Sequence, residues 1–268
     1  MKLATQDKPF FPVPLGEKLK AVRRLGFDTF EIDGRVLVEN LSEVKTAIKE
    51  SGVPVETVCG GYRGWIGDFD QEKRATAIAE ITRILQALAE INGRGIVVPA
   101  AWGMFSKRLP PLVPPRSEEE DREVLLDSLA KLNRVALATG TLIYLEPLNR
   151  YEDHMLNTLA AAGALIKAGN FAGVKLTADL FHMNIEEAGI ERSIHEAKAL
   201  LGHVHIADSH RYEPGTGHLD FVPIFKALKD SGYQGQMAFE CRVLGEPAAE
   251  AYRRSVAFIR ACLQEAGF

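Results

Sequence analysis

The sequence predicts an α/β fold, a single (β/α)8 TIM barrel that forms one catalytic domain over residues 1–268. Eight short β-rich segments alternate with longer amphipathic segments, and this alternation implies parallel strands joined by helical crossovers. Eight such units are the number that closes a barrel. A doubly wound open sheet is the structural rival, but the Gly-rich first turn that is typical of it is missing.

Local signals place each element. We expect strands at Lys2–Thr5, Thr29–Ile32, Val55–Cys59, Gly95–Pro99, Leu142–Glu146, Val174–Asp179, His203–Ile206 and Gln236–Glu240. We expect helices at Glu17–Leu25, Leu41–Ser51, Gln71–Ile91, Ser117–Thr139, Asn157–Ala168, Phe221–Ser231 and Ala248–Cys262. A Ser-Glu-Glu-Glu run at 117–120 is typical of a capping box, and glycines at positions 52, 93, 140 and 232 mark helix ends. The proline-rich stretch 109–115 is expected to be a long loop after the fourth strand.

Composition narrows the classes of protein to which this chain can belong. With 46% hydrophobic and 25% charged residues, it can bury a full-sized core and stay in solution. The net charge of −4 argues against a nucleic-acid partner, because phosphate binding needs a basic surface. No apolar run approaches the roughly 20 residues of a membrane span, and the first residues show no signal-peptide pattern, so we expect a cytoplasmic protein without a membrane partner. The cysteines, Cys59, Cys241 and Cys262, lie far apart and are expected to be reduced thiols.

Four of the late strands end in residues that can bind a metal. We call them the strand-end set: Glu146, Asp179, His205 and Glu240. In a parallel barrel the carboxyl ends of the strands meet at one mouth, where active sites are built. The alternative is a network of salt bridges, with His205 as an ordinary core histidine. Because a charge at the end of a buried strand is costly unless it is paired or bound to metal, four on adjacent strands favour a metal site.

The composition of the strand-end set predicts the kind of ion. Three carboxylates and one imidazole form an oxygen-rich site, which suits one divalent cation, with Mn²⁺ expected and Mg²⁺ or Co²⁺ as alternatives. A structural zinc would favour thiolate ligands. The sequence therefore predicts a metal-binding site with Glu146, Asp179, His205 and Glu240 as ligands.

Several motifs in the second half of the chain resemble those of a known family. They are Leu-Glu-Pro-Leu-Asn-Arg-Tyr-Glu at 145–152, Asp-Leu-Phe-His-Met-Asn-Ile-Glu-Glu at 179–187, and His-Val-His-Ile-Ala-Asp at 203–208, with Arg211 and Pro-Gly-Thr-Gly-His at 214–218. These segments resemble the sugar isomerase/epimerase TIM barrels, the xylose isomerase-like family. The greatest similarity is to the ketose 3-epimerases, which include the tagatose and psicose 3-epimerases. The resemblance is strong over residues 142–240 and only architectural over 1–140.

The resemblance implies a role for each matching residue. In that family the residues that match the strand-end set hold one divalent ion, commonly Mn²⁺. The residues that match Glu152, His182 and Arg211 contact substrate oxygens. By resemblance, Glu146 and Glu240 are also the catalytic acid/base pair, and the partner is a small sugar substrate.

The chemistry of proton transfer beside a carbonyl also favours Glu146 and Glu240 as the acid/base pair. Removing a proton beside a carbonyl forms an enediolate, which a divalent cation can stabilise by chelation as a Lewis acid. Inverting that carbon needs one group to take the proton from one face and another group to return it to the other face. Glu146 and Glu240 follow strands three steps apart around an eight-stranded ring, so they are expected to approach the mouth from nearly opposed directions.

Other interpretations remain open from the sequence. An aldose-ketose isomerase, a hydroxypyruvate-type isomerase or a keto-cyclitol dehydratase would use the same site. An apurinic endonuclease is remote, because its zinc site would need early histidines and all seven here lie at or after His154. His182 could instead cap a helical turn at 184–188, and Arg211 could instead pair with Glu213 in its loop. A homo-oligomer is compatible with all of these readings.

Overall fold

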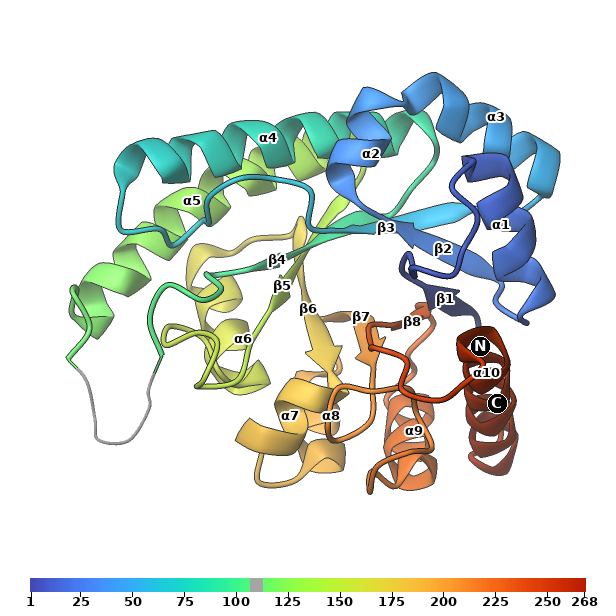
Figure 1. Ribbon diagram of the computed structural model, residues 1–268. Helices are drawn as coiled ribbons and strands as arrows, with labels where there is room; N and C mark the ends of the chain where they lie inside the picture. The colour runs from blue at the N-terminus through green and yellow to red at the C-terminus, as the bar shows by residue number, and fades with distance from the viewer. Residues whose placement is uncertain (107–112) are drawn as a thin grey trace.

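The computed structural model describes residues 1–106 and 113–268, and its centre is a closed barrel of eight parallel strands (Figure 1). The strands are β1 (Leu3–Thr5), β2 (Thr29–Ile32), β3 (Val55–Cys59), β4 (Gly95–Pro99), β5 (Leu142–Glu146), β6 (Val174–Asp179), β7 (Leu201–Ile206) and β8 (Met237–Phe239). Each strand pairs with the next along the chain, and β8 pairs with β1 in the register Leu3 to Met237. This pairing closes the ring and confirms the predicted (β/α)8 TIM barrel.

The strands β2 to β6 have the predicted bounds, and the differences lie in the remaining three. The β1 strand begins at Leu3 rather than Lys2, and β7 begins at Leu201, two residues earlier than predicted. The β8 strand ends at Phe239, so Glu240 follows the strand. The Glu240 N–H still donates to the Ile206 carbonyl at 3.1 Å, which keeps its side chain at the mouth of the barrel.

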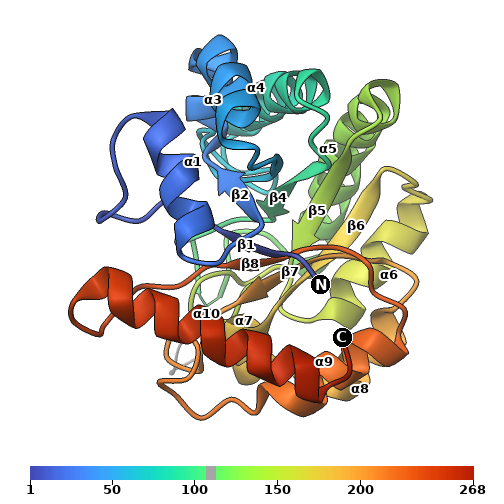
Figure 2. The same cartoon turned by 90° about the vertical axis from the view of Figure 1, so that its right-hand side faces the viewer.

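Helices surround the barrel on its outside, as Figures 1 and 2 show from two directions. They are α1 (Leu15–Arg24), α2 (Gly34–Glu39), α3 (Leu41–Ser51), α4 (Gln71–Glu90), α5 (Glu118–Thr139), α6 (Leu159–Gly169), α7 (Leu180–Glu186), α8 (Ile190–Ala197), α9 (Phe221–Asp230) and α10 (Ala248–Glu265). The predicted capping box at the start of α5 is confirmed. The proline-rich stretch predicted as a loop lies partly outside the described residues, over 109–112. Among the described residues, no helix combines the length and the apolar character needed to cross a membrane.

Three helices, α2, α7 and α8, were not predicted from the sequence, because they are too short for their periodicity to be evident. The α2 helix has six residues, and the side chain of Asp33 begins it by accepting from the backbone N–H groups of Arg35 and Val36. Such an Asx cap satisfies donors that a short helix cannot satisfy itself. With these short helices, the connection from β2 to β3 contains α2 and α3, and the connection from β6 to β7 contains α7 and α8.

Alternating side chains of each strand serve two different layers. On β2, Phe30 and Ile32 are 2% exposed and belong to the apolar layer between the barrel and the helices. Their neighbours Thr29 and Glu31 are equally buried, but they hydrogen-bond within the barrel, Thr29 to Gln236 just before β8 and Glu31 to Thr57 of β3. The apolar layer stabilises the fold, and the barrel interior is free to carry polar groups toward its mouth.

The tight packing at the amino ends of the strands gives a stability prediction. A Cβ at Gly95 would lie 2.5 Å from the Leu142 carbonyl oxygen, whereas a Cβ at Gly163 in α6 would lie 3.4 Å from the nearest side-chain atom. We expect Gly95→Ala to lower the free energy of unfolding by about 1–3 kcal/mol through overpacking. The control Gly163→Ala should raise it by about 0.5–1 kcal/mol, because alanine is the better helix former. Urea unfolding followed by circular dichroism measures both, and equal effects would contradict this packing.

Candidate functional site

The strand-end set converges on one point at the carboxyl end of the barrel. Its four residues each offer one ligand atom, and all of these atoms lie within 4.8 Å of one another. The Nδ1 atom of His205 lies 3.0 Å from Oε1 of Glu146 and 2.7 Å from Oε2 of Glu240. The same nitrogen lies 3.5 Å from Oδ2 of Asp179. The structure therefore brings together all four side chains that the sequence predicted as a group.

Asp179 has two tasks, and each uses a different oxygen. It ends β6 and is also the N-cap of α7, where Oδ1 accepts from the backbone N–H groups of Phe181 (2.9 Å) and His182 (3.1 Å). Its Oδ2 atom faces His205 and Arg211. Because the cap fixes the side chain, the local sequence both begins the helix and holds one oxygen toward the site. His182 lies inside α7, so the capping role considered for it belongs to Asp179.

Arg211 pairs with two members of the strand-end set. One guanidinium nitrogen donates to Asp179 at 2.7 Å and another donates to Glu240 at 2.6 Å. The arginine reaches them from a tight turn in which its own φ is 67°, a left-handed conformation that few non-glycine residues adopt. The alternative pairing with Glu213 is wrong, because the Glu213 carboxylate accepts backbone N–H groups of the loop after β8.

The turn that carries Arg211 is organised by Asp208. This buried carboxylate accepts four backbone N–H groups, those of Ser209 (2.8 Å), Gly215 (2.8 Å), Thr216 (3.2 Å) and Leu219 (3.2 Å). Burial raises the pKa of Asp208, but the hydrogen bonds from backbone N–H groups lower it by more than burial raises it. The pKa of Asp208 therefore lies below its usual value. The ionised carboxylate therefore holds the loop, and with it the arginine, in place.

Glu152 and His182 meet through Asn149. The side-chain amide of Asn149 donates to Oε1 of Glu152 at 2.9 Å, and the indole N–H of Trp102 donates to Oε2 at 2.8 Å. The backbone N–H of Asn149 donates to Nδ1 of His182 at 3.1 Å. Because a backbone N–H can only donate, Nδ1 is an acceptor, and the hydrogen of the neutral ring lies on Nε2. Burial lowers the pKa of His182, which favours this neutral form.

A cavity opens beside the strand-end set. Its volume is about 700 Å³, and its lining includes Trp102, Tyr151, Glu152, Phe181, Arg211 and Glu240. Of the residues predicted to contact substrate, Glu152 and Arg211 line this cavity. His182 is buried and packs edge-on against Phe181, with 5.2 Å between the ring centroids. The Glu240 side chain is 22% exposed, so this member of the set faces the cavity directly.

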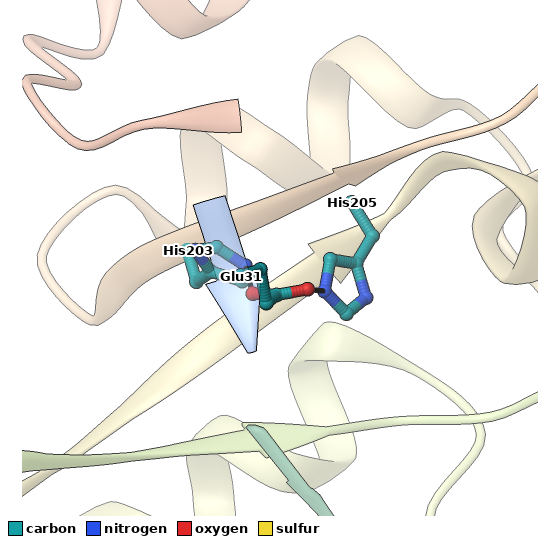
Figure 3. Close-up of side chains that lie close together, drawn as sticks. All are labelled: Glu31, His203 and His205. Carbon is teal, nitrogen blue, oxygen red and sulfur yellow. Dashed lines mark hydrogen bonds and ion pairs between the residues drawn. The ribbon is translucent and has the colours of Figure 1, made fainter. Parts of the chain in front are cut away.

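Sequence reasoning missed three residues that touch the site. Figure 3 shows Glu31 between His203 and His205, with Oε2 of Glu31 2.9 Å from Nε2 of His203 and Oε1 3.0 Å from Nε2 of His205. Cys59 ends β3, and its Sγ lies 3.6 Å from Oε1 of Glu240. Glu31 could have been found, because a carboxylate inside a buried strand is as costly as one at its end unless it has a partner. A cysteine carries no such signal.

The buried charges shift one another's pKa values in opposite directions. Burial raises the pKa of Glu146 to about 7, although His205 opposes this shift. Burial also raises the pKa of Glu240, but His205 and Arg211 outweigh it, so this pKa lies well below its usual value. Burial lowers the pKa of His205, yet the carboxylates around it, Glu240 first, raise it well above the usual value. The His205 imidazole and the Arg211 guanidinium thus provide the positive charge beside three carboxylates.

The donor set fits a divalent cation. One imidazole nitrogen can share one hydrogen with one acceptor, whereas three carboxylate oxygens of the strand-end set surround Nδ1 of His205. The other nitrogen of this ring, Nε2, already contacts Oε1 of Glu31 at 3.0 Å. An ion bound by one oxygen of each carboxylate and by this nitrogen would satisfy all four at once. A carboxylate behind the ligating histidine is the usual arrangement around protein-bound metals.

The barrel and the oxygen-rich group beside its open cavity define a class, the barrel enzymes that do their chemistry at the carboxyl ends of the strands. A family model described as the xylose isomerase-like TIM barrel matches residues 19–262. The chain belongs to this family.

Curated relatives include a 3-dehydro-D-guloside 4-epimerase of Escherichia coli, which is 54% identical over 98% of this chain and 100% of its own. An L-ribulose 3-epimerase of Mesorhizobium japonicum is 30% identical over 84% of this chain and 75% of its own. The crystal structure of an E. coli 3-keto-D-glucoside 4-epimerase superposes with a TM-score of 0.96 at 54% identity, covering 98% of this chain and 100% of that one. Relatives of this kind establish that the chain is an isomerase of the epimerase type.

The loop held by Asp208 gives a prediction for stability and its pH dependence. Asp208→Asn would turn an amide N–H₂ toward backbone donors, and we expect it to cost about 1–3 kcal/mol of unfolding free energy at pH 7. Since the folded pKa of Asp208 is lowered, its stabilisation is present above the ordinary aspartate pKa of about 3.9 and is lost as the pH falls through the lower folded value. The gap between variant and wild type should therefore narrow in strong acid.

The matched control is Asp220→Asn. Asp220 is the N-cap of α9 and accepts one backbone N–H, from Val222, and asparagine caps helices as well as aspartate does. Urea unfolding at several pH values should therefore detect a loss for position 208 and almost none for position 220. Equal losses at the two positions would show that Asp208 is an ordinary surface carboxylate.

Proposed function

We propose that the protein is a divalent-metal-dependent sugar epimerase that inverts a carbon next to a ketone. The observation that carries the proposal is the convergence of the strand-end set within 4.8 Å beside an open cavity. The fold supports the same conclusion, because barrel enzymes place their chemistry at this end. Mn²⁺ is the ion we favour, with Mg²⁺ or Co²⁺ as alternatives.

The proposed ligands are Glu146, Asp179, His205 and Glu240, and a bound cation would supply Lewis-acid stabilisation of the enediolate oxygens. Glu146 and Glu240 are the proposed acid/base pair. Glu146 comes from β5 and Glu240 follows β8, so they reach the mouth from different sides of the ring. One carboxylate removes the proton from one face of the carbon, and the other delivers a proton to the opposite face.

Three residues are proposed to hold the substrate hydroxyls. Glu152 and Arg211 line the cavity, and each offers a charged group to a sugar oxygen. His182 has its hydrogen on Nε2, so the neutral ring can donate to a hydroxyl once a substrate reaches it. Binding the hydroxyls in this way would orient the reacting carbon between Glu146 and Glu240.

The position of the ketone distinguishes two candidate reactions. The E. coli relative that is 54% identical is named for epimerisation at carbon 4 of a 3-dehydro-guloside. The relative that is 30% identical is named for epimerisation at carbon 3 of a ketose. Both names describe inversion of the carbon beside a ketone, so one mechanism serves both. The higher identity favours carbon 4 of a 3-keto glycoside, and the ketose 3-epimerase reaction is the second candidate.

The rim of the cavity supports the glycoside as substrate. Trp102 is 56% exposed and Tyr151 is 55% exposed, and both lie on the cavity lining. The cavity of about 700 Å³ is open beside these rings, so a substituent on the sugar could extend along them. Exposed aromatic faces of this kind pack against the apolar faces of sugar rings.

Solvent exchange tests the proposal. We expect incubation with Mn²⁺ and a 3-keto glycoside in D₂O to give an epimer that carries one deuterium at carbon 4, detected by NMR and mass spectrometry. Deuterium at carbon 3 of a free ketose, with no reaction of the glycoside, would select the 3-epimerase instead. If neither the 3-keto glycoside nor the free ketose exchanges a hydrogen beside its ketone, epimerisation is refuted.

Substitutions at Glu146 and Glu240 separate metal binding from proton transfer. Each glutamine variant keeps a ligand oxygen and the side-chain shape but cannot act as a carboxylate base. We expect Glu146→Gln and Glu240→Gln each to lower kcat by about 10²–10⁴-fold even when Mn²⁺ is in excess. The control Asp179→Asn should act mainly through metal affinity, so excess Mn²⁺ should restore part of its activity. Full recovery of both glutamine variants in excess Mn²⁺ would show that these glutamates are ligands only.

A further inference from the structure

Glu31 lies at the centre of a hydrogen-bond network inside the barrel. Figure 3 shows it between His203 and His205, the second of which belongs to the strand-end set. Its Oε1 atom faces the side-chain amide of Gln6 at 3.0 Å and Nε2 of His205 at 3.0 Å. Its Oε2 atom faces the hydroxyl of Thr57 at 2.6 Å and Nε2 of His203 at 2.9 Å. Polar side chains thus lie around both oxygens of a side chain that is 1% exposed.

The direction of the hydrogen bonds in this network is determined. The side-chain amide of Gln236 donates to the Thr57 hydroxyl at 2.6 Å, and its carbonyl oxygen accepts from Thr29 at 2.6 Å. Because the Thr57 oxygen accepts from the amide, its own hydrogen is free for Glu31. The Gln6 amide and the Thr57 hydroxyl thus each donate to one oxygen of Glu31, as they would to an ionised carboxylate, which can only accept. It follows that Nε2 of His205 is the donor in its contact with Glu31.

We infer that Glu31 is a positioning residue for the metal site: it accepts the Nε2 hydrogen of His205 and so turns Nδ1 toward the strand-end carboxylates. The inference rests on the proposed function, because it takes His205 as a metal ligand. An ion bound at Nδ1 would take the place of the hydrogen that this nitrogen carries in the charged ring, and the one remaining hydrogen would be the one that Nε2 donates to Glu31. The hydrogen bond also holds the plane of the ring, which a metal ligand requires.

A second ion held by Glu31, His203 and His205 is the rival for these residues, since their ligand atoms also lie within 4.8 Å of one another. The geometry argues against it. Each Glu31 oxygen already accepts from a neutral side chain, Gln6 on one and Thr57 on the other. All three side chains are at most 1% exposed, so no position remains open for water or substrate. The group supports one metal site from behind and does not form another.

The first test is Mn²⁺ binding by isothermal titration calorimetry with the purified protein. Glu31→Met has nearly the length of glutamate but no strong acceptor, and we expect it to raise the Mn²⁺ Kd by about 10–100-fold. The matched control is Thr57→Val, which removes a donor from the same carboxylate without touching His205. It should lower thermal stability and leave the Kd at the wild-type value. Equal weakening in both variants, or a stoichiometry of two ions in the wild type, would overturn the inference.

The second test is NMR spectroscopy of the wild-type protein, so its result does not depend on the folding of a variant. The wild-type protein labelled with ¹⁵N-histidine and loaded with diamagnetic Mg²⁺ should show His205 with a hydrogen on Nε2 and none on Nδ1 in long-range ¹H–¹⁵N spectra. A hydrogen on Nδ1 would overturn the inference.

The variant His205→Ala, tested by Mn²⁺ binding, distinguishes failure of this inference from failure of the proposed function. If His205→Ala leaves Mn²⁺ binding unchanged, His205 is not a ligand; if only His205→Ala weakens it, Glu31 does not position the ring.

Discussion

Burying carboxylates at the mouth of the barrel carries a large free-energy cost, and the surrounding side chains are arranged to offset it. Three carboxylates of the strand-end set meet around one imidazole nitrogen, and a fourth carboxylate, Glu31, lies behind the same ring. Unpaired buried charges are strongly destabilising, and one arginine and one imidazole provide less positive charge than four carboxylates require. The arrangement persists because the apolar layer outside the barrel stabilises the fold, and a divalent cation would complete the balance.

Parallel strands explain why these residues, distant in sequence, share one point. The carboxyl ends of β5, β6, β7 and β8 lie side by side, so the residue at or just beyond each end faces the mouth. The connecting loops then add groups that depend on local geometry. Asp208 folds the loop after β7 so that Arg211 reaches Asp179 and Glu240. The barrel provides the ligands, and the loops provide the substrate contacts and the cavity.

Much of this could be predicted from the sequence, because strand ends are marked by a change from apolar to charged residues. That signal placed Glu146 and Asp179 at their strand ends, whereas Glu31 lies inside β2 and was overlooked. The partners of Arg211 could not be predicted, because they depend on a positive φ and on four backbone hydrogen bonds to Asp208. The short helices α2, α7 and α8 could not be predicted either, since tertiary packing defines them more than periodicity does, and side-chain caps begin only α2 and α7 of the three.

Anomalous scattering from crystals grown with Mn²⁺ would show whether one cation binds where the strand-end set converges. We expect a single peak about 2.0–2.4 Å from an oxygen of each of the three carboxylates and from Nδ1 of the imidazole. A peak between Glu31, His203 and His205 would contradict a single ion at the strand-end set, as would a cluster of several ions. The absence of any peak at the mouth of the barrel would contradict it equally.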